Sequence, residues 1–373
     1  MNAPQSPPEI PTVLALAGLL RPLASANHPL HATARQEITA RAGELLQTLG
    51  IPGVLAVSLT DGERKNNPGP LLSLTVNGRP CWPGAEPVVR LLEGITKNAG
   101  GSQVTQRQLL EGLKETCLEM LKDQPDVLLD LPQAAVVAGE LEGPRRRKGS
   151  ARPDWPPEPA ALLIALRMPV GLGISIANRQ TAAQVIAANE PLWSAPEDLG
   201  EVLAGALSAR QIVILLPSER FRELTLAWQE KGGEAFNQLR LDLAKELGMN
   251  LPPFSLQPHP DMAPDQFAFR IQHIAGQPFS GLTLDNLLEN LAGEIRRLLP
   301  RLVVQPRVEA QLALVDDELR AMVQDRLPLP VLTRELRRRA RQGGGLRRLP
   351  LILEELLDVP FGAAGAPGTL ALR

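Results

Sequence analysis

The apolar residues in the first third of the chain fall into segments with helical and strand patterns. Residues 104–122 carry apolar side chains at the spacing of one buried helix face, and a helix is also expected over 34–49. Between them lie two short apolar runs, 54–60 and 71–78, which we interpret as strands. Gly50 is expected to end the first helix in the left-handed conformation that glycine favours.

The middle of the chain repeats this alternation. We expect a buried strand at 211–217, helices at 218–230 and 234–247, paired strands at 254–260 and 266–274, and a helix at 283–299. Ser218 is placed to cap the helix that follows the first of these strands. In the strand 266–274, Phe267, Phe269 and Ile271, together with His273, are expected to share one face.

The last part of the chain predicts three amphipathic helices. They cover 306–324, 327–342 and 346–358, with Pro330 near the start of the second helix and Pro350 in the first turn of the third. The glycines at 343–345 separate the second helix from the third. Helices with one apolar face and short connections are expected to pack as a small bundle.

Two segments of the chain resemble each other without a gap. Residues 41–80 align with 239–278 at a constant offset of 198, which places Gly50 on Gly248 and Pro80 on Pro278. We interpret this as a duplicated helix–strand–strand–helix module. Residues 104–113 then align with 282–291 at an offset of 178, so the first copy carries roughly twenty extra residues, as in a loop insertion.

The predicted fold class is α+β, with two similar modules in tandem and a small C-terminal helical bundle. The predicted parts are a disordered start at 1–12, modules at 13–141 and 160–304 joined by a linker at 142–159, the bundle at 305–358 and a disordered tail at 359–373. The apolar stretch 161–177 is interpreted as two buried strands with a turn at Pro169.

Composition limits the classes of function. The chain has 373 residues and a net charge of −2, so total charge gives no argument for nucleic-acid binding. The start of the chain lacks the basic residues of a signal peptide, and 161–177 is too interrupted to cross a bilayer. We therefore expect a cytoplasmic protein in which Cys81 and Cys117 are reduced thiols, either buried or idle, although a bridge between them is conceivable.

No motif in the sequence supports catalysis, a cofactor or a metal ion. The segment 343–348 lacks the strand and the Lys-Ser/Thr pair of a phosphate-binding loop, and Ser218 lacks the glycines of a nucleophile elbow. His28 and His31 have no third metal ligand, and His259 with Asp261 has no nucleophile nearby. The acidic run 316–318 is interpreted as a solvated helix face.

Four motifs in the second half resemble the cytoplasmic domain of the FHIPEP family, the export-gate proteins of type III secretion and flagellar export. They occur in the family's order: LRLDLAKELGMNLPPFSL at 239–256, MAPDQFAFRIQHIAGQPFSG at 262–281, PRVEAQLALVDDEL at 306–319 and LTRELRRRARQGGGLRRLPLILEELL at 332–357. The membrane half, part of the second subdomain and the last, ring-forming subdomain of the family have no counterpart in this sequence. The residues that dock partners in the family therefore have no matching positions.

The resemblance implies a non-enzymatic scaffold that binds proteins, with export-apparatus components or a second copy as partners. Two alternatives remain. One is an enzyme of unrecognised type with its site between the two modules, and the other is an adaptor for membranes or nucleic acid. The adaptor would use two basic clusters, Arg145–Lys148 and Arg337–Arg341, although a solvated loop explains the first more simply.

Overall fold

The structure is a computed structural model that describes residues 29–53, 57–61, 72–76, 79–80, 106–146 and 157–358. Helices and strands are mixed in it, as expected for an α+β chain. The chain divides into two compact units, Met1–Leu163 and Ile164–Arg373, here called the N-terminal and C-terminal units. The expected disordered segments at 1–12 and 359–373 lie outside the described residues.

The N-terminal unit contains the first helix–strand–strand–helix order expected from the sequence. Its elements are α2 (Pro29–Leu49), β1 (Val57–Asp61), β2 (Leu72–Val76), β3 (Arg79–Pro80), α4 (Gln106–Asp123), the 3-10 turn η1 (Pro125–Leu128) and α5 (Leu131–Arg146). Strands β1 and β2 are antiparallel neighbours, and β3 pairs with the other side of β2. Helices α2 and α4 pack together, and Leu113, Cys117 and Leu121 are buried on α4.

Helix α5 continues through Arg146, into the segment 142–159 that the sequence predicted as a linker. A reciprocal pair of hydrogen bonds starts this helix. The backbone N–H of Asp130 donates to Oε1 of Gln133 at 2.9 Å, and the N–H of Gln133 donates to Oδ1 of Asp130 at 3.0 Å. Such a capping box satisfies two N–H groups that the helix cannot bond internally. Lys148 lies outside the described residues.

The expected strands at 161–177 are wrong. Residues Pro159–Gly171 form helix α6, and an irregular segment follows it. Ala165, Leu166, Pro169 and Val170 are buried at helical spacing, so Pro169 lies inside the helix instead of forming a turn. An apolar run of this length fits either a buried strand or a buried helix, and tertiary packing decided for the helix. The next elements are α7 (Arg179–Ala188), η2 (Glu190–Ser194) and α8 (Pro196–Leu207).

The C-terminal unit is built on a mixed sheet. Its strands are β4 (Ile212–Pro217), β5 (Phe254–His259), β6 (Gln266–Ile271), β7 (Ile274–Ala275) and β8 (Phe279–Ser280). The order is β5-β4-β6-β7, with β8 also paired to β6, and β4 is parallel to β5 but antiparallel to β6. The expected direct pairing of the strands now labelled β5 and β6 is therefore wrong, because β4 lies between them.

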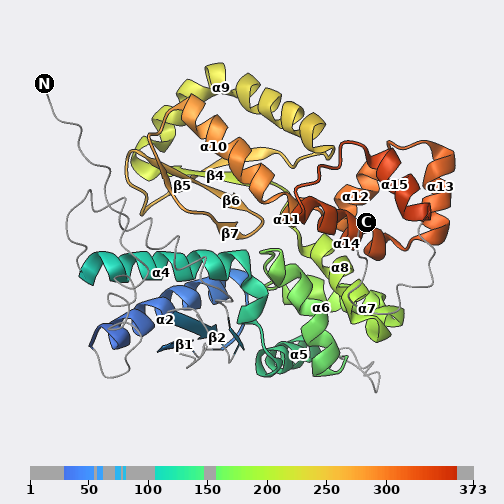
Figure 1. Ribbon diagram of the computed structural model, residues 1–373, viewed down its shortest axis with the longest axis horizontal. Coiled ribbons are helices and arrows are strands. Elements are labelled where there is room, and N and C mark those ends of the chain that lie inside the picture. The colour runs from blue at the N-terminus through green and yellow to red at the C-terminus, as the bar shows by residue number, and fades with distance from the viewer. Residues whose placement is uncertain are drawn as a thin grey trace, which may run out of the picture. The chain divides into compact units, whose positions relative to one another are not determined.

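Two helices cover one face of this sheet (Figure 1), namely α9 (Ser218–Leu247) and α10 (Leu284–Arg297). Phe267, Phe269 and Ile271 point into the core beneath them, which confirms the expected alternation along β6 for these three residues. Helix α9 is continuous through Gly232 and Gly233, where the sequence predicted two helices. Ser218 is its first residue and makes no capping bond, so its expected role as a cap is wrong.

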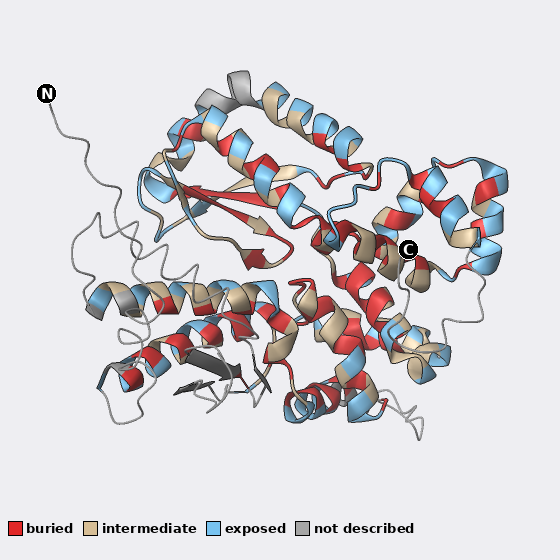
Figure 2. Cartoon of the chain, in the orientation of Figure 1, coloured by how far each residue is buried: buried red, intermediate tan, exposed pale blue. Residues whose placement is uncertain are grey.

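The remaining helices are α11 (Leu299–Leu302), α12 (Gln305–Leu312), α13 (Asp317–Arg326), α14 (Leu329–Arg341) and α15 (Leu349–Asp358). The single helix expected over 306–324 is divided into α12 and α13, because the side chain of Asp316 caps the N-terminus of α13. One continuous core joins these helices to α9, α10 and the sheet. Figure 2 shows the buried residues on the inward sides of these elements.

The two segments that align in sequence share their helix ends. Gly50 and Gly248 both adopt the left-handed conformation, with φ of 69° and 70°. In both, the N–H of the next residue reaches five residues back, from Ile51 to the carbonyl of Leu46 at 2.9 Å and from Met249 to that of Ala244 at 3.2 Å. The strands that follow differ, since β1 pairs directly with β2, whereas β4 separates β5 from β6. None of the helices in the described ranges has both the length and the apolar character that a membrane span requires.

Candidate protein-binding groove

A groove of about 690 Å³ lies where the end of α14 and the start of α15 meet the end of α9. Four arginines line it, Arg338 and Arg339 from α14 and Arg347 and Arg348 from the loop before α15. We call this surface the arginine groove. The apolar side chain of Leu351, which is 50% exposed, also lines it.

Carboxylates neutralise part of this positive charge. Arg338 binds Glu335 through two hydrogen bonds of 2.6 and 2.8 Å, and the hydrogen bond to Glu335 raises the pKa of Arg338. Arg339 also contacts Glu335, and its Nη1 donates to Glu355 on α15 at 2.8 Å. These pairs fix the α14 side of the groove, although exposed ion pairs add little to stability.

Arg347 and Arg348 form no ion pair with a carboxylate among the described residues, and both side chains are exposed. On the opposite wall, Glu246 at the end of α9 is held by Arg296 through bonds of 2.7 and 2.8 Å. That hydrogen bonding lowers the pKa of Glu246, so the carboxylate is charged at neutral pH. The groove therefore keeps an excess of positive charge at Arg347 and Arg348.

A close backbone contact positions the loop that carries these two arginines. The N–H of Leu346 donates to the carbonyl of Leu247 at 2.9 Å, which satisfies an acceptor at the end of α9. A Cβ atom at Gly248 would lie 2.2 Å from the backbone N of Arg347, so this position requires glycine for space as well as for its φ of 70°. The segment 343–348 thus separates two helices and also docks against a third.

Arg337 directly precedes the groove residues on α14, but its side chain is buried. Arg337 is 2% exposed, and its guanidinium binds both carboxylate oxygens of Glu201, which is fully buried, at 2.6 and 2.8 Å. It also donates to the carbonyl of Val303 at 2.7 Å, which links α14 to α8 and to the segment after α11. The basic cluster 337–341 expected for a membrane or nucleic-acid adaptor therefore loses its first member to the core.

Another buried polar network joins the β6–β7 turn to neighbouring segments. Gln272 has a positive φ of 58° and accepts a hydrogen bond from the N–H of Ala209 at 2.8 Å. In His273, Nδ1 accepts a hydrogen bond from the N–H of Ser175 at 3.0 Å. Burial and the nearby charge of Arg270 lower the pKa of His273. The imidazole is therefore neutral at pH 7 and acts as an acceptor, and His273 does not continue the Phe267 face as the sequence predicted.

The residues weighed for chemistry in the sequence do not form a site in the described part of the chain. His259 ends β5 and Asp261 is exposed beyond it, with no hydrogen bond between their side chains among those found. His31 is buried on α2, and His28 is outside the described residues. Within the described ranges, no three His, Cys, Asp or Glu side chains gather as metal ligands would. Asp316 is a helix cap, so the acidic run 316–318 is more than a solvated face.

Sequence reasoning had not identified the arginine groove. The signal in the sequence is the pair of arginines that follows three glycines, a segment that predicts only a break between helices. Their position beside Arg338 and Arg339 depends on the turn between α14 and α15, and residue spacing alone does not give it. No protein-family model matches the chain. A search of curated proteins also found no match.

Proposed function

We propose that this chain is a non-enzymatic scaffold that binds an acidic, partly apolar segment of another protein in the arginine groove. The observation that carries this proposal is the pair Arg347 and Arg348. Both are exposed beside the exposed Leu351, and neither has a carboxylate partner in the part of the chain that the structure describes. Charge at such a surface steers a partner of opposite sign, and an apolar floor adds affinity by burial.

A protein segment fits this groove better than a nucleic acid or a membrane surface. Glu246 and Glu355 stand among the arginines and would repel a continuous row of phosphates. The net charge of the whole chain is −2, so total charge gives no support for binding a polyanion. A short peptide can place its acidic side chains on Arg347 and Arg348 and an apolar side chain on Leu351.

The proposal includes kinship with the cytoplasmic domain of the type III export gate and an origin of the two modules by duplication. The order from β4 to α15, which is a strand, a helix, four strands, a helix and a final helical segment, supports the kinship. The matched helix ends at Gly50 and Gly248 support the duplication. Under this proposal the two modules diverged in strand order after the duplication, because the strands that follow the two glycines pair differently.

Fluorescence anisotropy tests the groove directly. The probe is a short labelled peptide that alternates Glu with Leu, titrated with the full chain at low salt. We expect saturable binding that weakens by roughly tenfold or more in the variant Arg347→Glu/Arg348→Glu, because charge reversal replaces attraction with repulsion. Unchanged affinity in this variant would contradict the proposal, as would stronger binding of the wild type to duplex DNA or to vesicles of anionic lipid.

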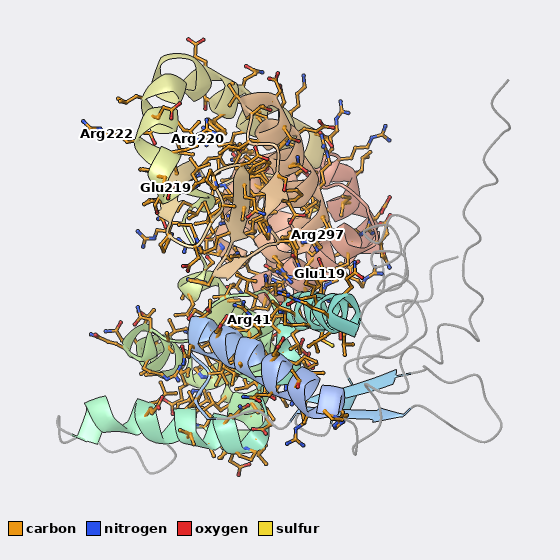
Figure 3. The ribbon with its side chains drawn as sticks, turned by 90° about the vertical axis from the view of Figure 1, so that its left-hand side faces the viewer. Arg41, Glu119, Glu219, Arg220, Arg222 and Arg297 are labelled. Carbon is orange, nitrogen blue, oxygen red and sulfur yellow. The ribbon has the colours of Figure 1, made fainter. Side chains whose placement is uncertain are left out.

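A control variant separates the groove from general charge effects. Arg222 is exposed in the second turn of α9, and its side chain extends away from the helix (Figure 3). Arg222→Glu changes the net charge in the same direction but lies outside the groove. We expect it to bind the Glu–Leu peptide with wild-type affinity.

A further inference from the structure

The β5 strand has an open edge. It lies at the end of the sheet order β5-β4-β6-β7, so among the described residues it pairs only with β4. An edge strand of this kind presents backbone N–H and C=O groups that another extended chain can bond. Natural edges are often blocked by charge or proline, and here only Pro258 does so.

The pairing with β4 determines which backbone groups face outward. The N–H of Ile212 donates to the carbonyl of Pro253 at 3.0 Å, and Ile212 stands opposite Phe254. In a parallel ladder the bonded residues alternate, so Ser255 and Gln257 face β4 while Phe254 and Leu256 face away. Pro258 is another residue whose backbone faces away from β4, so its missing N–H breaks no bond to β4. Phe254 and Leu256 thus remain available to a new strand.

A pocket of about 370 Å³ adjoins this edge, between α9 and β5. Its apolar walls include Ile214, Phe236, Phe254 and Leu256. Phe236 and Phe254 meet edge to face with ring centroids 6.4 Å apart, which fixes the inner wall. Side chains of an added strand alternate between the two sheet faces, so every second one would point toward this pocket.

The rim of the pocket is positive and apolar. The guanidinium of Arg240 donates to the neutral amide oxygen of Asn237 at 3.1 Å and forms no ion pair with a described carboxylate. Phe254 and Leu256 of β5 supply the apolar lining beside it. A ligand that places an apolar group in the pocket and a carboxylate near Arg240 would complement both features.

We infer that the β5 edge is a docking site for an extended segment of a partner protein. The segment adds a strand beside Phe254 and Leu256, inserts one large apolar side chain between α9 and β5, and places an acidic side chain on Arg240. Backbone hydrogen bonds supply affinity for any extended chain, and the pocket with Arg240 selects its sequence. This site is separate from the arginine groove and does not depend on it.

A second copy of the chain is a poorer occupant. Identical antiparallel edge strands are related by a two-fold axis perpendicular to the sheet, so both copies of α9 would lie on the same sheet face. Each Arg240 would then approach the other pocket with the same charge. Pro258 also limits the length of such a pairing.

Peptide selection on the full chain tests the site. A phage-displayed library of random linear peptides is panned against the protein, and enriched peptides are synthesised and titrated. We expect sequences with an aromatic or large aliphatic residue near Asp or Glu, whose affinity falls about tenfold or more in Arg240→Glu and in Asn237→Trp. Arg240→Glu reverses the rim charge, whereas Asn237→Trp obstructs the pocket from an exposed helix position.

Residue-resolved hydrogen exchange gives a second readout that does not depend on a variant. On peptide binding, the amides of Phe254 and Leu256 should become protected, while those of Ser255 and Gln257 are already protected by β4. The proposal is overturned if no enriched peptide loses affinity in both variants, or if protection at Phe254 and Leu256 rises with protein concentration alone. The second outcome would identify a second copy as the occupant.

The groove variant distinguishes this site from the proposed function. Arg347→Glu/Arg348→Glu should leave the affinity of the selected edge peptides unchanged. Conversely, Arg240→Glu should not weaken the Glu–Leu peptide in the arginine groove. Loss of both peptides in either variant would show a common structural defect, and circular dichroism of the variants identifies that case.

Discussion

Arg337 and Arg347 lie ten positions apart in one basic segment but belong to two different environments. Arg337 is buried against Glu201 and the carbonyl of Val303, whereas Arg347 is exposed in the arginine groove and pairs with no carboxylate of the described ranges. Removing one partner of a buried ion pair destabilises the fold, because the charge that remains is buried without compensation. An exposed one contributes little to folding and remains free to bind. Burial, and not residue type, therefore separates the structural arginine from the solvent-exposed one in this unit.

Removing the buried partner should produce the largest effect. Arg337→Ala leaves Glu201 buried without a counter-charge, and we expect the free energy of unfolding to fall by about 3–5 kcal/mol. Denaturation in guanidinium chloride measures this change. The control is the double variant Arg337→Met/Glu201→Leu, which removes both charges and should recover most of the loss. A loss below about 1 kcal/mol for Arg337→Ala would show that the pair does not hold α14 to α8.

Substitution of Gly248, which packs against the backbone of Arg347, should give the second largest loss of stability. Gly248→Ala should destabilise the chain by about 3 kcal/mol or more, because the added Cβ overlaps the backbone of Arg347 and the residue keeps a positive φ. Gly343→Ala is the matched control, since Gly343 has a φ of 78° but open space around its Cβ position. It should cost only about 1–2 kcal/mol. Equal losses in thermal denaturation would argue against the close contact.

His273 should make stability depend on pH in a smaller and reversible way. Its pKa is lowered in the folded chain by burial and by Arg270, so the unfolded chain binds the proton more readily. The contribution of His273 to the free energy of unfolding is therefore complete above the ordinary pKa of 6.5 and decreases as the pH falls below that value. Urea denaturation between pH 5 and 8 measures it. His273→Gln keeps an acceptor for Ser175 and should flatten this part of the pH profile.

The exposed arginines should have the smallest effect on folding. Arg347→Ala and Arg348→Ala are expected to change the free energy of unfolding by no more than about 0.5 kcal/mol each, because neither side chain is buried and neither pairs with a carboxylate that the structure describes. Denaturant melts of each variant beside the wild type check this. A loss comparable with that of Arg337→Ala would remove the distinction between the two environments.

The sequence predicted the elements whose ends are marked by local chemistry. Gly50 and Gly248 end their helices as expected, and the glycines after α14 separate it from α15. Errors arose where packing overrode local pattern. The apolar stretch around Pro169 forms a helix. Asp316 is an exception, because its cap is a local signal that the prediction of one helix over 306–324 missed. Strand order also depends on long-range pairing, which placed β4 between β5 and β6.

The candidate sites were harder to predict for a similar reason. The sequence showed Arg337–Arg341 as one basic cluster, but helical geometry turns Arg337 inward and leaves Arg338 and Arg339 at the groove. The pocket beside β5 depends on Phe236 and Phe254 meeting across two elements. No local motif encodes either arrangement, since both depend on contacts between segments that are distant in the chain.

The most direct test measures the affinity of the Glu–Leu peptide at low and at physiological salt for the wild type and for Arg347→Ala/Arg348→Ala. The account predicts that salt weakens binding to the wild type, because screening acts on exposed charges. The double variant should bind weakly at both salt concentrations while unfolding at the same denaturant concentration as the wild type. Wild-type affinity in this variant, with the same salt dependence, would contradict the assignment of the arginine groove as a binding surface.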